Sequence, residues 1–157
     1  MAGRFDYTQA EEIRDAFARH RVRYLFIGKS GAVLLGYPDT TQDADLFVEK
    51  SNENGSGCVA GLRELGFELS DVTAAEIRRG KDFVQLKNGP FDLDLVFAPD
   101  GIESFDAAWR NRIDTEGFPV CHPDDIIRSK EAAGRAKDIE SLPRLRAFRD
   151  YWKSQRP

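Results

Sequence analysis

Short apolar runs alternate along this chain with segments whose apolar residues recur at helical spacing. The apolar runs predict strands at 24–27, 43–48, 67–69, 83–86 and 91–97. The periodic segments predict helices at 8–20, 32–35, 59–66, 73–79, 105–111, 124–133 and 137–155, with a tight turn at 28–31, a loop at 51–57 and a hairpin turn at 87–90. This order favours an α/β (α+β) fold in which a small mixed β-sheet is backed by helices.

The length of 157 residues is near the commonest size of a single domain. We expect one domain, residues 1–157, with a core at about 22–120 and a C-terminal helical segment at about 122–157. Hydrophobic residues make up 41% of the chain, which excludes disordered and fibrous classes. No apolar run approaches the roughly 18 residues of a membrane-spanning helix, and the first residues lack the apolar stretch of a signal peptide. The sequence therefore predicts a soluble, cytoplasmic protein with no membrane partner.

The cysteines and histidines of the chain argue against a zinc site. Cys58 and Cys121 lie in unlike contexts without Cys-x-x-Cys spacing, and His20 and His122 are the only histidines. A structural zinc ion takes four such ligands, usually at close spacing. We expect both cysteines to be reduced and structural.

Charge is distributed unevenly along the chain. The net charge is −4, but residues 126–157 carry nine basic side chains against four acidic ones. That C-terminal segment is positive, and the rest of the chain is correspondingly acidic. A positive segment can bind an anion, or it can simply be the solvated face of a helix.

Two predicted strands carry acidic residues in alternation. Side chains alternate across a strand, so Asp43 and Asp45 lie on one face, and Asp92 and Asp94 lie on one face of their own strand. If the strands are neighbours, these acids converge. Like charges about 4 Å apart repel by roughly 4 kcal/mol at an effective dielectric of about 20, so such a cluster needs a cation. Carboxylate oxygens favour Mg²⁺ or Mn²⁺, and two such ions can assist a phosphoryl displacement. A lone Asp-x-Asp pair is also typical of a polar strand end without a chemical role.

A glycine-rich turn lies between the first strand and the next short helix. The backbone N–H groups of Gly28, Lys29 and Ser30 are placed to cradle phosphate. The turn is not a P-loop, because Arg23 stands where that motif needs its first glycine. It is not a dinucleotide-binding turn either, because Ser30 and Val33 replace two of the required glycines.

The combination of these motifs resembles the polymerase-beta-type nucleotidyltransferase superfamily. The resemblance rests on Gly28-x-Ser30, on Asp43-x-Asp45 in a strand and on a later strand acid in Leu93-Asp94-Leu95. The segments 36–45, 94–109 and 125–138, the last with Lys130-x4-Arg135-x-Lys137-Asp138, are similar to a minimal bacterial branch that contains abortive-infection-type toxin nucleotidyltransferases. The resemblance covers about residues 22–146.

The resemblance implies roles for particular residues. Asp43 and Asp45 would be metal ligands, and Asp94 would be the third ligand and take the proton of the acceptor hydroxyl. Lys130 would act at the active site, and Gly28, Lys29, Ser30 and Lys130 would bind the nucleotide. The cofactor would be Mg²⁺ or Mn²⁺, the substrate an NTP, and an antitoxin-like protein could be a partner.

Three points stay open at this stage. Lys29 and Asp39 depart from the family, which usually has Gly or Ser at the first position and often Arg near the second. Asp92 shares a face with Asp94 and is the alternative third acid. Lys130 can pair with Asp138 across the helix junction instead of serving the active site.

The function that follows is transfer of a nucleoside monophosphate from an NTP to an acceptor hydroxyl or phosphate, with release of pyrophosphate. The acceptor stays open between RNA such as tRNA, a protein and a small molecule. The alternative is a degenerate, non-catalytic module that binds a nucleotide or a partner, for which Lys29 and Asp39 are the support in the sequence.

Overall fold

The computed structural model describes residues 5–156, within which six strands form one mixed sheet in the order β3-β4-β2-β1-β6-β5. The strands are β1 (Tyr24–Phe26), β2 (Ala44–Val48), β3 (Phe83–Leu86), β4 (Leu93–Val96), β5 (Ile113–Thr115) and β6 (Phe118–Val120). β2 pairs with β4 and β1 with β6 in parallel, whereas the other three neighbouring pairs are antiparallel. The predicted fold class, a small mixed sheet backed by helices, is confirmed.

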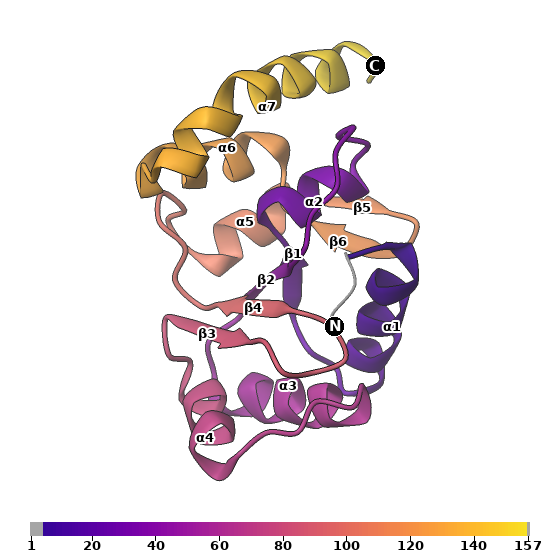
Figure 1. The fold of residues 1–157 in the computed structure, drawn as a ribbon, viewed down its shortest axis with the longest axis vertical. Helices are drawn as coiled ribbons and strands as arrows, with labels where there is room; N and C mark the ends of the chain where they lie inside the picture. The colour runs from indigo at the N-terminus through magenta and orange to yellow at the C-terminus, as the bar shows by residue number, and fades with distance from the viewer. Residues whose placement is uncertain (1–4, 157) are drawn as a thin grey trace.

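Helices cover the two faces of the sheet unequally (Figure 1). They are α1 (Tyr7–Arg19), α2 (Gly28–Leu34), α3 (Asn52–Glu64), α4 (Asp71–Arg79), α5 (Phe105–Asn111), α6 (Pro123–Ala133) and α7 (Ala136–Ser154). One large apolar cluster joins α1, α3 and α4 to all the central strands. On the other face a smaller cluster packs α5 and α6 over β1 and β2, where Phe105 lies against Phe47. The acid-bearing side of β3 and β4 has no such helical cover among residues 5–156.

The direction of the strands gathers several helix and strand ends at one end of the sheet. β1 and β6 are parallel and lead into α2 and α6, while β2 runs antiparallel to β1 and begins at that same end. β4 is parallel to β2 and begins there too. The start of β2, the start of β4 and the starts of α2 and α6 therefore meet.

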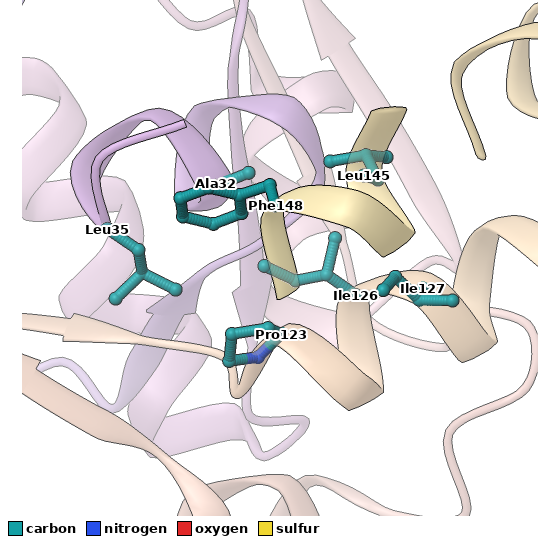
Figure 2. Close-up of a pocket in the computed structure, with 7 residues that line it drawn as sticks. All are labelled: Ala32, Leu35, Pro123, Ile126, Ile127, Leu145 and Phe148. Carbon is teal, nitrogen blue, oxygen red and sulfur yellow. The ribbon is translucent and has the colours of Figure 1, made fainter. Parts of the chain in front are cut away.

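An apolar junction holds α2, α6 and α7 together (Figure 2). It is lined by Ala32, Leu35, Pro123, Ile126, Ile127, Leu145 and Phe148. Close packing of this kind fixes the relative position of the three helices, because any shift would open voids or cause clashes. The polar residues of α6 and α7 are thereby held at a defined place beside the start of α2.

Three predicted elements differ from the structure, and one hairpin of the structure was not predicted. Residues 52–57, predicted as loop, are the first turns of α3, which Ser51 caps by accepting a hydrogen bond from the backbone N–H of Asn54. The glycines that suggested a loop allow close packing instead: a Cβ on Gly55 would lie 2.7 Å from Cα of Arg78, and one on Gly57 would lie 2.8 Å from the His20 carbonyl oxygen. α2 begins at Gly28, so the predicted turn at 28–31 is helical. Residues 67–69 form no strand, whereas the β5–β6 hairpin was not predicted.

No helix within residues 5–156 combines the length and the apolar character that crossing a membrane requires.

Candidate active site

Asp45 and Asp94 lie side by side across the parallel pair β2–β4. Their Cα atoms are register partners, so both side chains leave the same face of the sheet. Asp92 precedes β4, and its carbonyl accepts a hydrogen bond from the Ala44 N–H at 3.1 Å. The strand register therefore places Asp94, and not Asp92, opposite Asp45.

Crowding of negative charge shifts the acidities of these carboxyl groups. Burial raises the pKa of Asp45 well above its usual range, and the charges of Asp94 and Asp43 raise it further. Burial likewise raises the pKa of Asp94, and Asp43 adds to that shift. Asp43, at the residue before β2, is thus close enough to act on both. Of the four acids that the sequence predicts to converge, Asp43, Asp45 and Asp94 are close enough to interact in this way.

Whether these acids fit a divalent cation depends on their chemistry and on their arrangement. Carboxylate oxygens under mutual repulsion are the hard, anionic donors that Mg²⁺ and Mn²⁺ prefer. Within residues 5–156, however, no group of three or more His, Cys, Asp or Glu side chains already has the arrangement of a metal site. The donor set fits the metal, with Asp45 and Asp94 as its adjacent pair and Asp43 as a nearby third acid.

Gly28 is the residue that lets α2 approach Asp45. Its φ is +63°, a backbone conformation that favours glycine. A Cβ at this position would lie 2.6 Å from Oδ2 of Asp45, inside the normal contact distance. Any other residue here would push the Asp45 carboxylate away or move the helix.

Ser30 ties α2 to β2 by hydrogen bonds in the protein interior. Its hydroxyl donates to the Ile27 carbonyl at 2.9 Å and accepts from the backbone N–H of Asp45 at 2.9 Å. The residue is fully buried. Ser30, whose backbone N–H the sequence places in a phosphate cradle, thus uses its side chain to position the backbone of Asp45.

The two residues that depart from the family pattern bind each other. Nζ of Lys29 lies 3.0 Å from Oδ2 of Asp39, and Arg144 of α7 reaches the same carboxylate oxygen at 3.5 Å. The hydrogen bond from Lys29 holds the pKa of Asp39 below its usual value. The ion pair neutralises both side chains locally, and with Arg144 it links the start of α2 to α7.

Lys130 both pairs with Asp138 and faces the acids. Its Nζ lies 3.4 Å from Oδ1 of Asp138, a fully buried carboxylate that also binds Nε of Arg135 at 2.7 Å. The positive charge of Lys130 lowers the raised pKa of Asp45, so it stands close to that acid. The two interpretations of Lys130 left open by the sequence are compatible, because one lysine has both neighbours.

A basic cavity extends from Lys130 between α2, α6 and α7. It has a volume of about 220 Å³ and is lined by Lys29, Tyr37, Asp39, Lys130, Lys137, Glu140, Ser141, Arg144 and Leu145. Four lining side chains are cationic and two are acidic. Elsewhere in the C-terminal segment, basic residues are paired with acids: Arg128 with Asp125, and Arg149 and Lys153 with Asp124. Three of the lining cations are paired as well, Lys29 and Arg144 with Asp39 and Lys130 with Asp138.

Sequence reasoning did not identify Gln85 as part of this site. Gln85 is the register partner of Asp94 in the antiparallel pair β3–β4, and hydrogen bonding from its side chain opposes the rise in the pKa of Asp94. Lys87, just beyond β3, acts on Asp94 in the same direction. The predicted hairpin turn at 87–90 would pair Gln85 with Asp92, whereas the connection in the structure spans 87–92 and shifts the register by two residues, to Asp94.

Comparison with known proteins supports the fold. No protein-family model and no curated protein sequence matches the chain. Among solved structures, the chain is similar to a Thermotoga maritima protein described as a "putative nucleotidyltransferase", with a TM-score of 0.51 and 17% identity over 93% of this chain and 91% of that one. The similarity supports the predicted nucleotidyltransferase fold, and it does not extend to the toxin-type branch. The chain accordingly has a nucleotidyltransferase fold. In this fold the sheet carries two adjacent acids, Asp45 and Asp94, and a basic cavity lies between the helices.

Proposed function

We propose that this protein is a metal-dependent nucleotidyltransferase that moves a nucleoside monophosphate from an NTP to an acceptor hydroxyl or phosphate. The observation that carries the proposal is the register of β2 and β4, which sets Asp45 beside Asp94 with Lys130 close to them. Adjacent buried carboxylates destabilise a fold unless a cation neutralises them, so their presence on two neighbouring strands favours a function.

The three acids would hold Mg²⁺ or Mn²⁺. Asp45 and Asp94 supply the adjacent pair of carboxylates, and Asp43 supplies a third. When bound, such a metal neutralises the charge that builds up on the phosphate oxygens during transfer. Gly28 and Ser30 act by keeping Asp45 in place, through the space at Gly28 and the hydrogen bond from the Asp45 N–H.

The basic cavity would take the triphosphate. Lys130 lies between the acids and the cavity, and Lys29, Lys137 and Arg144 line it further out. Lysine meets phosphate as a point charge and arginine as a planar fork, so both suit a polyphosphate. Asp138, a buried carboxylate that also pairs with Arg135, holds Lys130 in position by an ion pair.

In the transfer itself, the acceptor oxygen forms a bond to the α-phosphorus while the bond from that phosphorus to the bridging oxygen of the β-phosphate breaks. Pyrophosphate leaves with the bonding electrons. Asp94 would take the proton of the acceptor hydroxyl, the role that the resemblance implies for it. Positioning and charge neutralisation account for the rest of the catalysis.

The experiment that tests the proposal combines labelled transfer with two matched variants. Protein, Mg²⁺ and α-labelled NTPs are incubated with a cell extract, and pyrophosphate release is measured in parallel. We expect Asp94→Asn to abolish transfer and Asp92→Asn to have a much milder effect, because only Asp94 lies opposite Asp45. The reverse ranking would contradict the assignment of Asp94.

A non-catalytic module is the second candidate. Two side chains that could otherwise bind phosphate are already engaged within the protein, which favours this candidate. The Lys29 ammonium group pairs with Asp39, and the Ser30 hydroxyl donates to the Ile27 carbonyl. Titration calorimetry with NTP and Mg²⁺ distinguishes the two, because a module binds the nucleotide and releases no pyrophosphate. Co-purification from cells would test the antitoxin-like partner that the toxin-type resemblance adds to the proposal.

A further inference from the structure

Strand β3 forms an edge of the sheet and carries an exposed aromatic residue. Phe83 is 48% exposed, although large apolar side chains are usually buried. Its side chain leaves the same face as Asp94, because Phe83 pairs with Val96 and Gln85 pairs with Asp94 in one antiparallel register. The exposed ring therefore lies on the acid-bearing face, where α5 and α6 do not reach.

Basic residues surround this ring. Phe83 lines an open groove of about 720 Å³ together with Lys50, Arg79, Gly80, Lys81 and Asp82. Three of these side chains are cationic and one is acidic. Lys81 pairs with Glu76 at 2.9 Å, whereas among residues 5–156 no ion pair within 4 Å involves Lys50 or Arg79. We call Lys50, Arg79, Lys81 and Phe83 the β3 strip.

The strip leads to the candidate active site. Phe83 and Gln85 are two residues apart on one strand, which at about 3.3 Å per residue is roughly 7 Å. Gln85 is beside Asp94, and Lys87 lies close enough to lower the pKa of that acid. A chain bound along the strip would bring its end to Asp94 from the side opposite the triphosphate cavity.

We infer that the β3 strip binds a single-stranded nucleic acid whose terminal hydroxyl is the acceptor. Cations next to an exposed aromatic ring match the two parts of a nucleotide, since cations attract the backbone phosphates and the ring stacks on a base. A positive groove on an otherwise acidic protein favours a polyanion over a neutral or basic partner. The inference rests on the proposed function, because it assigns the acceptor of that reaction.

The test measures binding without turnover. Fluorescence anisotropy follows a labelled 12-residue oligoribonucleotide, and separately an oligodeoxyribonucleotide, with protein free of NTP and metal. We expect Phe83→Ala to weaken binding by about 5-fold or more, the effect of losing one stacked base. Phe83→Trp should retain binding. Arg79→Ala should weaken binding and make the dependence of log K on log salt less steep by about one unit, as expected for one lost phosphate contact.

Tyr151→Ala is the matched control, because Tyr151 is an aromatic residue 63% exposed on α7, far along the chain from β3. Circular dichroism and Tm establish that each variant is folded. Binding within about 2-fold of the unmodified protein for both Phe83→Ala and Arg79→Ala would overturn the inference, as would equal loss in Tyr151→Ala. The inference would also be overturned if the protein binds no oligonucleotide but self-associates, and Phe83→Ala abolishes that self-association. That result would make the strip a protein interface.

The result is separable from the proposed function. If the label of the NTP is transferred to an acceptor but the strip variants bind oligonucleotide normally, the assignment of the β3 strip is wrong and the transferase proposal is retained. If the strip variants lose oligonucleotide binding but no NTP is consumed, the strip is a nucleic-acid surface and the transferase proposal fails.

Discussion

Replacing Gly28 with alanine should separate the positioning of Asp45 from the stability of the fold. The left-handed φ of +63° costs a non-glycine residue roughly 1–2 kcal/mol. The new Cβ would also lie 2.6 Å from Oδ2 of Asp45, so the carboxylate must move by about 1 Å to restore normal contact. Displacement of a reacting group by about 1 Å can cost about 100-fold in rate, which is about 2.7 kcal/mol of barrier.

Gly134→Ala is the matched control for the backbone term. Gly134 has the same φ of +63°, and the nearest atom to its added Cβ is the Glu131 carbonyl oxygen at 3.8 Å. Urea unfolding should show a loss of about 1–2 kcal/mol in Gly134→Ala and a larger loss in Gly28→Ala, which adds the contact with Asp45 to the same backbone cost. Only Gly28→Ala should lose transfer activity, measured as kcat/KM for the NTP.

A double-mutant cycle tests whether the Asp45 carboxylate is the source of the clash. The pair Gly28→Ala with Asp45→Ala should be more stable than the sum of the single effects, because truncated Asp45 leaves room for the new methyl group. Additive effects, or full activity in Gly28→Ala, would refute the argument that glycine is needed to accommodate Asp45.

Four further predictions concern charge. Asp45 and Asp94 have raised pKa values, so the folded state holds protons that the unfolded chain releases. The free energy of unfolding should therefore fall as pH rises above 3.8, the usual pKa of an aspartate, until the raised pKa values are passed. Urea unfolding of Asp45→Asn should show a flatter dependence of stability on pH. Asp43→Asn and Asp45→Asn should each reduce transfer by more than 10-fold, which a steady-state assay checks. Mg²⁺ or Mn²⁺ should raise Tm, and more so with NTP present, relative to EDTA-treated protein; no shift at millimolar Mg²⁺ with NTP would count against the enzyme. Lys130→Ala should raise KM for the NTP with little change in Tm, since Asp138 keeps Arg135 as a partner. Lys130→Arg should restore part of the lost activity, because it keeps the positive charge. A large fall in Tm with unchanged kcat/KM would make Lys130 purely structural.

The elements with a regular apolar period are those that the sequence predicts well. The helices at 105–111, 124–133 and 137–155 agree with α5, α6 and α7 to within a residue or so at each end, and the strands at 43–48 and 83–86 agree with β2 and β3. Alternation along β2 correctly turns Ala44 and Leu46 into the core and Asp45 to the other face. Periodicity is local, so it requires no knowledge of the neighbours of an element.

Failures occur where a distant contact decides the local structure. The glycines of residues 51–57 indicate a loop by themselves, yet the backbone of Arg78 and the carbonyl of His20 approach so closely that only glycine fits in the helix there. β5 and β6 are short strands that form through pairing with each other and with β1, and three residues carry too little pattern to be seen. Propensity is a weak prior that tertiary contacts override.

For the site, the sequence alone determined which residue types could do the chemistry: acids in strand alternation, a glycine turn and a basic C-terminal segment. Only the tertiary structure decided which of them meet. The parallel register of β2 and β4 puts Asp94, and not Asp92, opposite Asp45, the fold brings Lys130 near enough to Asp45 for its charge to lower the pKa of that acid, and Lys29 pairs with Asp39. The physical reason is that side-chain direction follows from the period of an element, whereas the distance between two elements follows from strand pairing and core packing between residues far apart in the chain.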